Sequence, residues 1–100
     1  MTDEPDLAAE AHKNLDRLRA EMERVDLALI ELIAKRVAIS RAVGSAKRSA
    51  ALPPLDPTRE AAVIRRVTEL AREVGAPEED VRYIFWHLIG MSRRIQVGGD

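Results

Sequence analysis

Apolar residues recur along the first half of the chain at the three- and four-residue spacing of an α-helix. Between residues 6 and 49 there is no proline, and the apolar period is helical almost throughout. One apolar seam at heptad spacing runs through Leu15, Leu18, Met22, Val25, Leu29, Leu32, Arg36, Ile39 and Val43. The pattern predicts one helix of roughly 40 residues, about 60 Å long. A compact domain of this size has a radius of gyration of only about 13 Å, so a single copy cannot cover the helix.

Two shorter helices are predicted after this one. Consecutive prolines after Leu52 end the first helix and form a stiff linker. Asp56 and Pro57 then begin a second helix as its N-cap and first helical residue, and Gly75 suits its C-terminal cap. Pro77 opens the third helix, with acidic residues in its first turn. The predicted apolar face of the second helix is Val63, Ile64, Val67, Leu70, Ala71 and Val74. That of the third helix is Val81, Ile84, Phe85, Leu88, Ile89, Ser92 and Ile95. Strand signals are absent, so the predicted fold is all-α with three helices.

The length of 100 residues suits a single domain. We expect residues 1–14 to form an acidic, partly frayed extension in which Asp6 caps the first helix. Residues 15–97 then form the helical domain, and residues 98–100 form a short tail. Gly44 costs about 1 kcal/mol relative to alanine inside a helix, so we expect a close packing contact there.

Charge and composition narrow the classes of function. The net charge is -1 with 33% charged residues, so no basic excess favours nucleic acid. The arginine pair Arg93-Arg94 is interpreted as part of a solvated face. The chain has no cysteine, and its two histidines, His12 and His87, share no ligand spacing, so we expect no metal site. No apolar run suits a membrane span or a signal peptide, which predicts a cytoplasmic protein.

Polar residues occupy inward-facing positions on all three helices. Arg36 interrupts the apolar seam, and burying an unpaired charge costs several kcal/mol, so it needs a partner or a ligand. Lys47 lies near the same stripe, and Glu60 lies on the apolar face of the second helix. Ser92 and Gln96 continue the stripe of the third helix. Each residue alone could serve a solvated surface or a helix terminus. Together they predict a pocket for a small polar anion.

Helix geometry adds a prediction of a dimer. Arg36 and Lys47 are 11 residues apart, about 16 Å along the axis, so two long side chains can reach one small ligand. Arg19 and Lys47 are 28 residues apart, about 42 Å, and cannot share a small pocket within one chain. If Arg19 binds the ligand, it must reach the site of a second copy. Antiparallel pairing of the long helices permits this and gives a homodimer with two equivalent sites.

The ordered set of these segments resembles a known family. The resemblance spans residues 15–96 and rests on the segments LRAEMERVD, LIELIAKR, VGSAK, DPTRE and MSRRIQ. These segments are similar to those of the all-helical chorismate mutases of the small bacterial type. The resemblance implies an intertwined homodimer of three-helix protomers that binds chorismate. It also implies catalysis without a metal or cofactor.

The resemblance also implies a role for each site residue. Arg36 matches the arginine that holds one substrate carboxylate, and Arg19 matches its counterpart from the partner chain. Lys47 matches the lysine that contacts a carboxylate and the ether oxygen, and Gln96 matches the second donor to that oxygen. Glu60 is similar to the acceptor for the ring hydroxyl, so the expected catalytic residues are Arg36, Lys47, Glu60 and Gln96. Three further residues are expected to line the pocket: Asp56, Arg59 and Ser92.

Two other functions fit parts of the pattern. An isochorismate pyruvate lyase uses the same scaffold, but such relatives tend to lack the glutamate that matches Glu60 and to have a more apolar pocket. Glu60 and Ser92 therefore favour the mutase. A non-catalytic helical dimerisation or regulatory module would treat Arg36 as an interface ion pair and would bind no small dianion. Such a module has little use for the inward positions of Glu60, Ser92 and Gln96.

Overall fold

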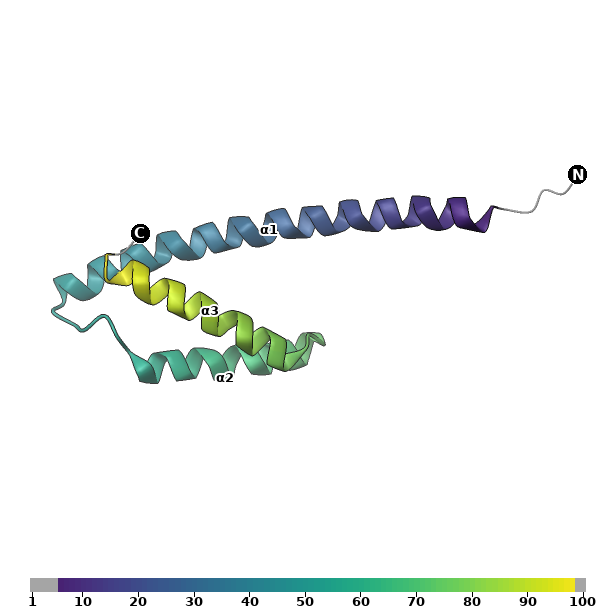
Figure 1. Ribbon diagram of the computed structural model, residues 1–100. Coiled ribbons are helices and arrows are strands. Elements are labelled where there is room, and N and C mark those ends of the chain that lie inside the picture. Colours follow the sequence, from purple (N-terminus) through teal and green to yellow (C-terminus); the bar gives the residue numbers. More distant parts are fainter. Residues whose placement is uncertain (1–5, 99–100) are drawn as a thin grey trace, which may run out of the picture. The chain divides into compact units, whose positions relative to one another are not determined.

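Three α-helices make up the protein in the computed structural model, which describes residues 6–98 (Figure 1). In chain order they are α1 (Leu7–Ser49), α2 (Pro57–Val74) and α3 (Glu78–Gln96). Within residues 6–98 there is no strand, so the predicted all-α fold is confirmed. None of these helices is both long enough and apolar enough to cross a membrane.

Local sequence signals set the helix ends. The Asp6 carboxylate accepts a hydrogen bond of 3.1 Å from the backbone N–H three residues later, which caps α1. The Asp56 carboxylate makes the same contact at 3.0 Å and caps α2. Gly75 ends α2 in the left-handed conformation with φ 76°, which glycine adopts without steric strain. The three predicted caps are confirmed. The third helix begins one residue later than predicted, because Pro77 is its extended N-cap residue.

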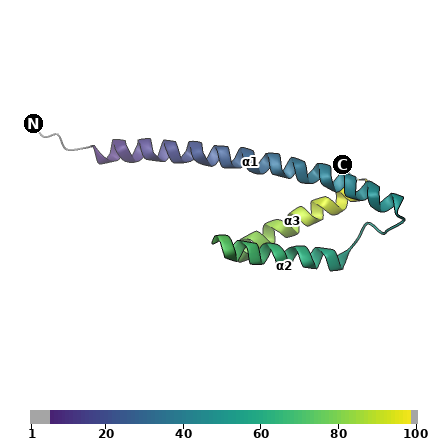
Figure 2. The same ribbon diagram turned by 180° about the vertical axis from the view of Figure 1, so that it is seen from behind.

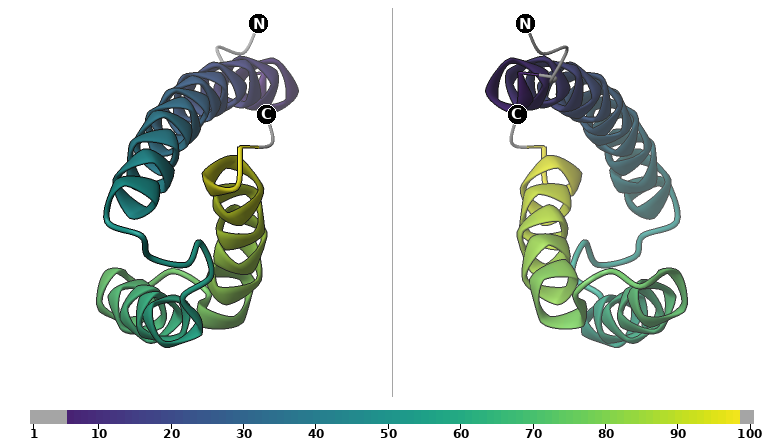
Figure 3. Two further views of the ribbon diagram at one scale, coloured as in Figure 1. Left: turned by 90° about the vertical axis from the view of Figure 1, so that its left-hand side faces the viewer. Right: turned by 90° about the vertical axis from the view of Figure 1, so that its right-hand side faces the viewer.

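The chain divides into two compact units, one up to Ala34 and one from Lys35 onward. In the second unit α3 leaves the C-terminal end of α2 and returns to the C-terminal part of α1, residues 35–49 (Figure 2 and Figure 3). The α2 and α3 helices pack on each other and bury a small set of apolar side chains: Ile64, Val67, Ala71 and Ile89.

Several residues of the predicted apolar faces are exposed in the single chain. On α2, Leu70 is 43% exposed and Val74 is 78% exposed, and Ile84 on α3 is 54% exposed. The periodicity identified the apolar face of each helix correctly, but it did not identify which turns have a neighbouring helix to pack against. These three residues therefore lie on the predicted apolar faces but outside the buried core of the single chain.

In the unit up to Ala34, the apolar seam of α1 is exposed. Its six members in this unit have exposed fractions between 41% and 61%: Leu15, Leu18, Met22, Val25, Leu29 and Leu32. This agrees with the expectation that one copy cannot cover the long helix. The division into residues 1–14, 15–97 and 98–100 stays a prediction, and residues 1–5 and 99–100 lie outside the described residues.

The close packing predicted at Gly44 is confirmed. A Cβ atom at Gly44 would lie 2.6 Å from the carbonyl oxygen of Gln96 and 2.9 Å from its Cα atom. The Arg48 Nη1 atom donates to the same carbonyl oxygen at 2.9 Å. Glycine therefore allows the C-terminal end of α3 to approach the backbone of α1, and Arg48 holds it there.

Candidate active site

A cavity of about 450 Å³ lies in the unit from Lys35 onward, within the usual size range of small-molecule sites. Its walls come from the C-terminal part of α1, the start of α2 and the C-terminal half of α3. Seven of the eight predicted site residues line it: Arg36, Lys47, Asp56, Arg59, Glu60, Ser92 and Gln96. Residues from three distant parts of the sequence thus line one cavity.

Arg36 is half-buried and bonded to α3. Its Nη1 atom donates to the Leu88 carbonyl at 3.3 Å and to the Ser92 hydroxyl. The Ser40 hydroxyl also donates to the Ser92 oxygen, at 3.0 Å, and both serines are buried. A hydroxyl accepts two hydrogen bonds and donates one, so Ser92 keeps its own proton for a further acceptor. Both of these acceptors of Arg36 are neutral, so the bonds orient the guanidinium and leave its positive charge to attract an anion.

Lys47 and Gln96 are in direct contact. The Lys47 Nζ atom donates to the Gln96 side-chain oxygen at 2.7 Å and to the Pro54 carbonyl at 2.9 Å. Because the Gln96 oxygen accepts from Lys47, the amide NH₂ group is left to donate to a ligand. Lys47 has three N–H donors and uses two of them here. The pair can therefore present two donors to one oxygen atom.

The N-terminus of α2 forms another wall of the cavity. One carboxylate oxygen of Asp56 accepts a hydrogen bond from the backbone N–H of Arg59 and caps α2. The side chain of Arg59 is cationic and exposed. The positive end of the α2 dipole lies at this wall, which favours a bound anion. Both residues thus add to the polar, mainly cationic lining.

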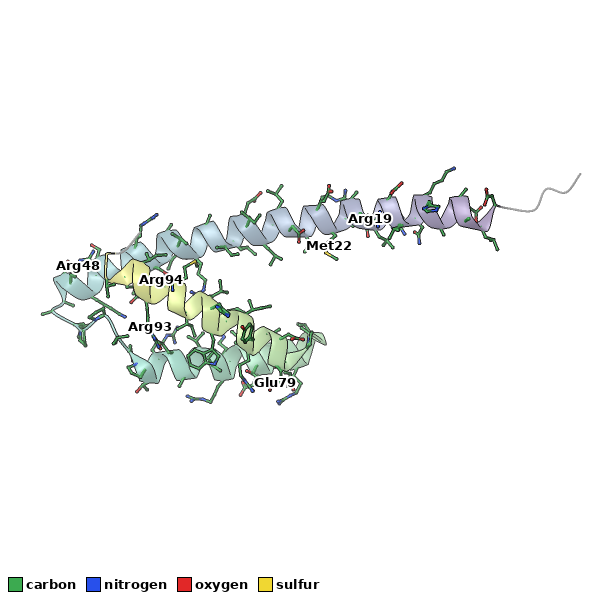
Figure 4. All side chains as sticks on the ribbon, viewed as in Figure 1. Arg19, Met22, Arg48, Glu79, Arg93 and Arg94 are labelled. Atoms are coloured by element: carbon green, nitrogen blue, oxygen red, sulfur yellow. The ribbon has the colours of Figure 1, made fainter. Side chains whose placement is uncertain are left out.

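Glu60 is held by an arginine that the sequence analysis assigned to a solvated face. The Arg93 Nε atom donates to Glu60 Oε2 at 2.8 Å, and its Nη2 atom donates to the other carboxylate oxygen. The hydrogen bond from Arg93 lowers the pKa of Glu60, and this outweighs burial, which raises it. The pKa of Arg93 is raised in turn by its bond to Glu60. Figure 4 shows Arg93 on the side of α3 that faces α2.

Arg93 is exposed, as expected for a solvated face, but it also lines the cavity, which was not predicted. A helical signal for this was present in the sequence. Arg93 follows the buried residue Ile89 by four positions, which places both on one face of α3. The two arginines were interpreted together as one pair, although only Arg93 lines the cavity and Arg94 does not.

Arg19, the eighth predicted site residue, belongs to the unit up to Ala34 and is exposed there (Figure 4). It is not among the residues that line the cavity. Its role in binding stays a prediction.

The site has the chemistry of anion binding. Among residues 6–98 there is no group of three or more His, Cys, Asp or Glu side chains that could hold a metal ion. The lining residues supply guanidinium, ammonium, amide, hydroxyl and carboxylate groups. Such groups can bind a small dianion with a hydroxyl and can stabilise negative charge at an oxygen.

Comparison with known proteins identifies the family. The family model for chorismate mutase type II matches residues 18–97, which include most of α1, all of α2 and α3, and the whole cavity lining. The chain belongs to the chorismate mutase type II family. The resemblance drawn from the sequence segments is thereby confirmed.

Several members of the family are similar to this chain. A bifunctional chorismate mutase/prephenate dehydratase from Aquifex aeolicus is 29% identical over 92 residues, which cover 85% of this chain and 25% of that protein. An intracellular chorismate mutase from Mycobacterium tuberculosis is 36% identical over 56 residues, which cover 56% of this chain and 53% of that protein. The matches thus span about half, or less, of the length of these curated chorismate mutases.

A solved structure supports the fold. A conserved hypothetical protein from Pyrococcus furiosus matches with a TM-score of 0.68 and 32% sequence identity, over 83% of this chain and 95% of that chain. The fold is therefore similar to that of a solved structure.

Proposed function

We propose that the protein catalyses the rearrangement of chorismate to prephenate, with no covalent intermediate and no cofactor. The observation that carries this proposal is the contact between Lys47 and Gln96, at 2.7 Å, inside a cavity that also holds Arg36 and Glu60. Chorismate is a dianion with an ether oxygen and a ring hydroxyl. The cavity offers groups of matching chemistry for each of these features.

In the proposed mechanism the enzyme acts by orientation and by electrostatic stabilisation. Arg36 binds one carboxylate and helps to hold the folded conformer in which the reacting carbons approach each other. The concerted shift breaks the C–O bond of the ether, and negative charge grows on its oxygen. The Lys47 ammonium and the Gln96 amide donate to that oxygen. Because this charge is larger in the transition state than in the substrate, their bonds strengthen there and lower the barrier.

The remaining lining residues bind and align the substrate. Glu60 accepts from the ring hydroxyl, and the free proton of Ser92 is available to a carboxylate. Asp56 and Arg59 shape the wall at the start of α2. The second carboxylate is assigned to Arg19 of a partner chain.

A homodimer is part of the proposal. The exposed apolar seam between Leu15 and Leu32 supports it, because soluble monomers rarely expose a long apolar stripe. Pairing of two long helices would cover the seam. It would also supply Arg19, which the sequence argument assigns to the site of the second copy.

The proposed pathway and location follow from the substrate. Prephenate is a precursor of phenylalanine and tyrosine, and the name of the Aquifex relative combines chorismate mutase with prephenate dehydratase. We propose a cytoplasmic location, which the name of the intracellular mycobacterial relatives supports.

Product analysis tests the proposed function. The purified protein is incubated without added metal with chorismate and, separately, with isochorismate, and the products are identified by chromatography. We expect rapid conversion of chorismate to prephenate. Pyruvate released from isochorismate with little prephenate would assign the protein to the lyases. Inertness toward both compounds would refute an enzymatic role for the cavity on either substrate.

A further inference from the structure

The contact between Arg93 and Glu60 is unlike an ordinary surface ion pair. The two residues are 33 positions apart and join α3 to α2. The planar guanidinium bonds to both oxygens of the carboxylate, the geometry in which arginine fixes a carboxylate most firmly. The Glu60 side chain is only 15% exposed, whereas that of Arg93 is 47% exposed. The arginine thus approaches from the solvent side and fixes a mostly buried carboxylate.

Stabilisation of the fold is a weak explanation for this pair. Ion pairs with a partly exposed partner contribute little to stability, because water screens the attraction and a long side chain loses its freedom. Both partners line the cavity, as do Lys47 and Ser92. The position of the pair therefore points to a role in ligand binding.

We propose that Arg93 is a positioning residue that keeps the Glu60 carboxylate ionised and oriented as the acceptor for a hydroxyl of the substrate. This inference rests on the proposed function, in which Glu60 binds the ring hydroxyl of chorismate. A carboxylate has about four acceptor sites. The guanidinium fork uses one on each oxygen, so each oxygen keeps one for the substrate.

The charges around Glu60 explain why a dedicated arginine is useful. On α3, the bond from Arg93 is the largest effect and lowers the pKa of Glu60. Lys47 on α1 acts weakly in the same direction, whereas burial and the N-cap Asp56 raise it. Arg36 on α1 and Arg59 on α2 are the other charged residues that line the cavity. Without Arg93, desolvation and the Asp56 charge would leave the pKa of Glu60 higher than in the wild type.

The inference predicts a specific kinetic change. A bond to the ring hydroxyl forms in the bound substrate and in the transition state alike, so its loss weakens binding more than turnover. We expect Arg93→Gln to raise the KM for chorismate by about tenfold, which corresponds to one hydrogen bond of ordinary strength. We expect kcat to stay within about twofold. The acidic limb of kcat/KM should move to higher pH, because Glu60 loses the group that most lowers its pKa.

The experiment compares Arg93→Gln, Arg93→Lys and the matched control Arg94→Gln, which removes the neighbouring arginine outside the cavity lining. For each variant kcat and KM for chorismate are measured across the acidic and neutral pH range. Lysine keeps the positive charge of Arg93 but cannot bond to both carboxylate oxygens at once. We therefore expect Arg93→Lys to have the acidic limb of the wild-type kcat/KM profile but a raised KM. In a Glu60→Gln background, Arg93→Gln should cause no further rise in KM, because the group it positions is already changed. The control should match the wild type.

A direct titration separates this inference from the proposed function. The carboxyl carbon of Glu60 is followed by NMR in the ligand-free wild type and in Arg93→Gln, and its pKa should rise in the variant. An unchanged pKa, together with an unchanged KM, would overturn the inference while the wild type still produced prephenate. A lower KM in Arg93→Gln would also overturn it, because Arg93 would then compete with the substrate for Glu60. If the wild type converts no chorismate, the proposed function fails, and the titration still decides whether Arg93 keeps Glu60 ionised.

Discussion

Replacement of Gly44 by alanine should damage the active site from a position outside it. Gly44 does not line the large cavity. Its Cα nevertheless faces the last residue of α3, where a new Cβ atom would lie 2.6 Å from the carbonyl oxygen of Gln96. The new Cβ atom is fixed to the backbone of α1, and the carbonyl oxygen is part of the backbone of α3, so a change of side-chain rotamer cannot relieve the clash. The end of α3 must instead move away from α1.

The size of the movement follows from the geometry. Ordinary van der Waals contact of a Cβ atom begins at 3.4 Å, so α3 must retreat by about 0.8 Å. The same movement stretches the 2.9 Å bond between Arg48 and the Gln96 carbonyl. It also separates the Gln96 side chain from Lys47. A displacement of about 1 Å in a group that aligns the reacting atoms can cost on the order of 10²-fold in rate.

The effect on stability should be much smaller than the effect on rate. Alanine is favoured over glycine in a helix by about 1 kcal/mol, whereas overpacking costs about 1–3 kcal/mol. The net loss is therefore about 0–2 kcal/mol, which lowers Tm by up to about 10 °C. We expect Gly44→Ala to stay folded with kcat/KM for chorismate reduced by roughly 10²-fold.

Gly90→Ala is the matched control. A Cβ atom at Gly90 meets only the Arg94 Nη1 atom, at the ordinary distance of 3.8 Å. This variant should keep wild-type kcat/KM and gain up to about 1 kcal/mol of stability from helix propensity. Thermal unfolding and chorismate turnover are measured for both variants at one protein concentration. If Gly44→Ala retained wild-type activity and gained stability as Gly90→Ala does, the close approach at Gly44 would not position Gln96.

Three further results are expected. Inactive Arg19→Ala and Lys47→Ala chains, mixed under verified subunit exchange, should regain activity because each heterodimer has one intact site; no recovery would refute sites shared between chains. The free energy of unfolding should fall as the pH decreases below about 5, because the folded-state pKa of Glu60 lies below its unfolded value, so protonation favours the unfolded chain. Urea titrations should show that this acid-induced decrease in the free energy of unfolding is smaller for Arg93→Gln than for the wild type. Equal decreases would contradict the ion pair between Arg93 and Glu60. Asp56→Ala should lower stability by about 1 kcal/mol through loss of the α2 cap, and an unchanged urea midpoint would contradict this.

Local signals in the sequence were enough to predict the helices and the inward-facing polar residues Arg36, Lys47, Glu60, Ser92 and Gln96. The caps at Asp6, Asp56 and Gly75 depend on a few neighbouring residues, which is why their positions are confirmed. Arg36 and Glu60 were recognised because a charged residue on an apolar stripe is costly unless it has a partner. The confirmed contact at Gly44 follows from the same reasoning about cost.

Contacts between distant residues could not be predicted in the same way. The bond between Glu60 and Arg93 depends on how α2 and α3 cross, and periodicity on one helix does not specify a crossing. Leu70 and Val74 have the spacing of core residues, but burial depends on which turns meet another helix. The predicted role of Arg19 would depend on a second copy of the chain, and periodicity can suggest a partner helix but does not specify how two copies align.

The proposed stabilisation of the ether oxygen by Lys47 and Gln96 is tested by the rate at which Lys47→Ala and Gln96→Ala convert chorismate to prephenate. Lys35→Ala serves as the control, because this exposed lysine on α1 does not line the cavity. We expect each cavity variant to lose on the order of 10²–10³-fold in kcat while circular dichroism and oligomeric state match the wild type. The control should keep full activity. Wild-type turnover in both folded cavity variants would show that the charge on the ether oxygen is not stabilised at this site.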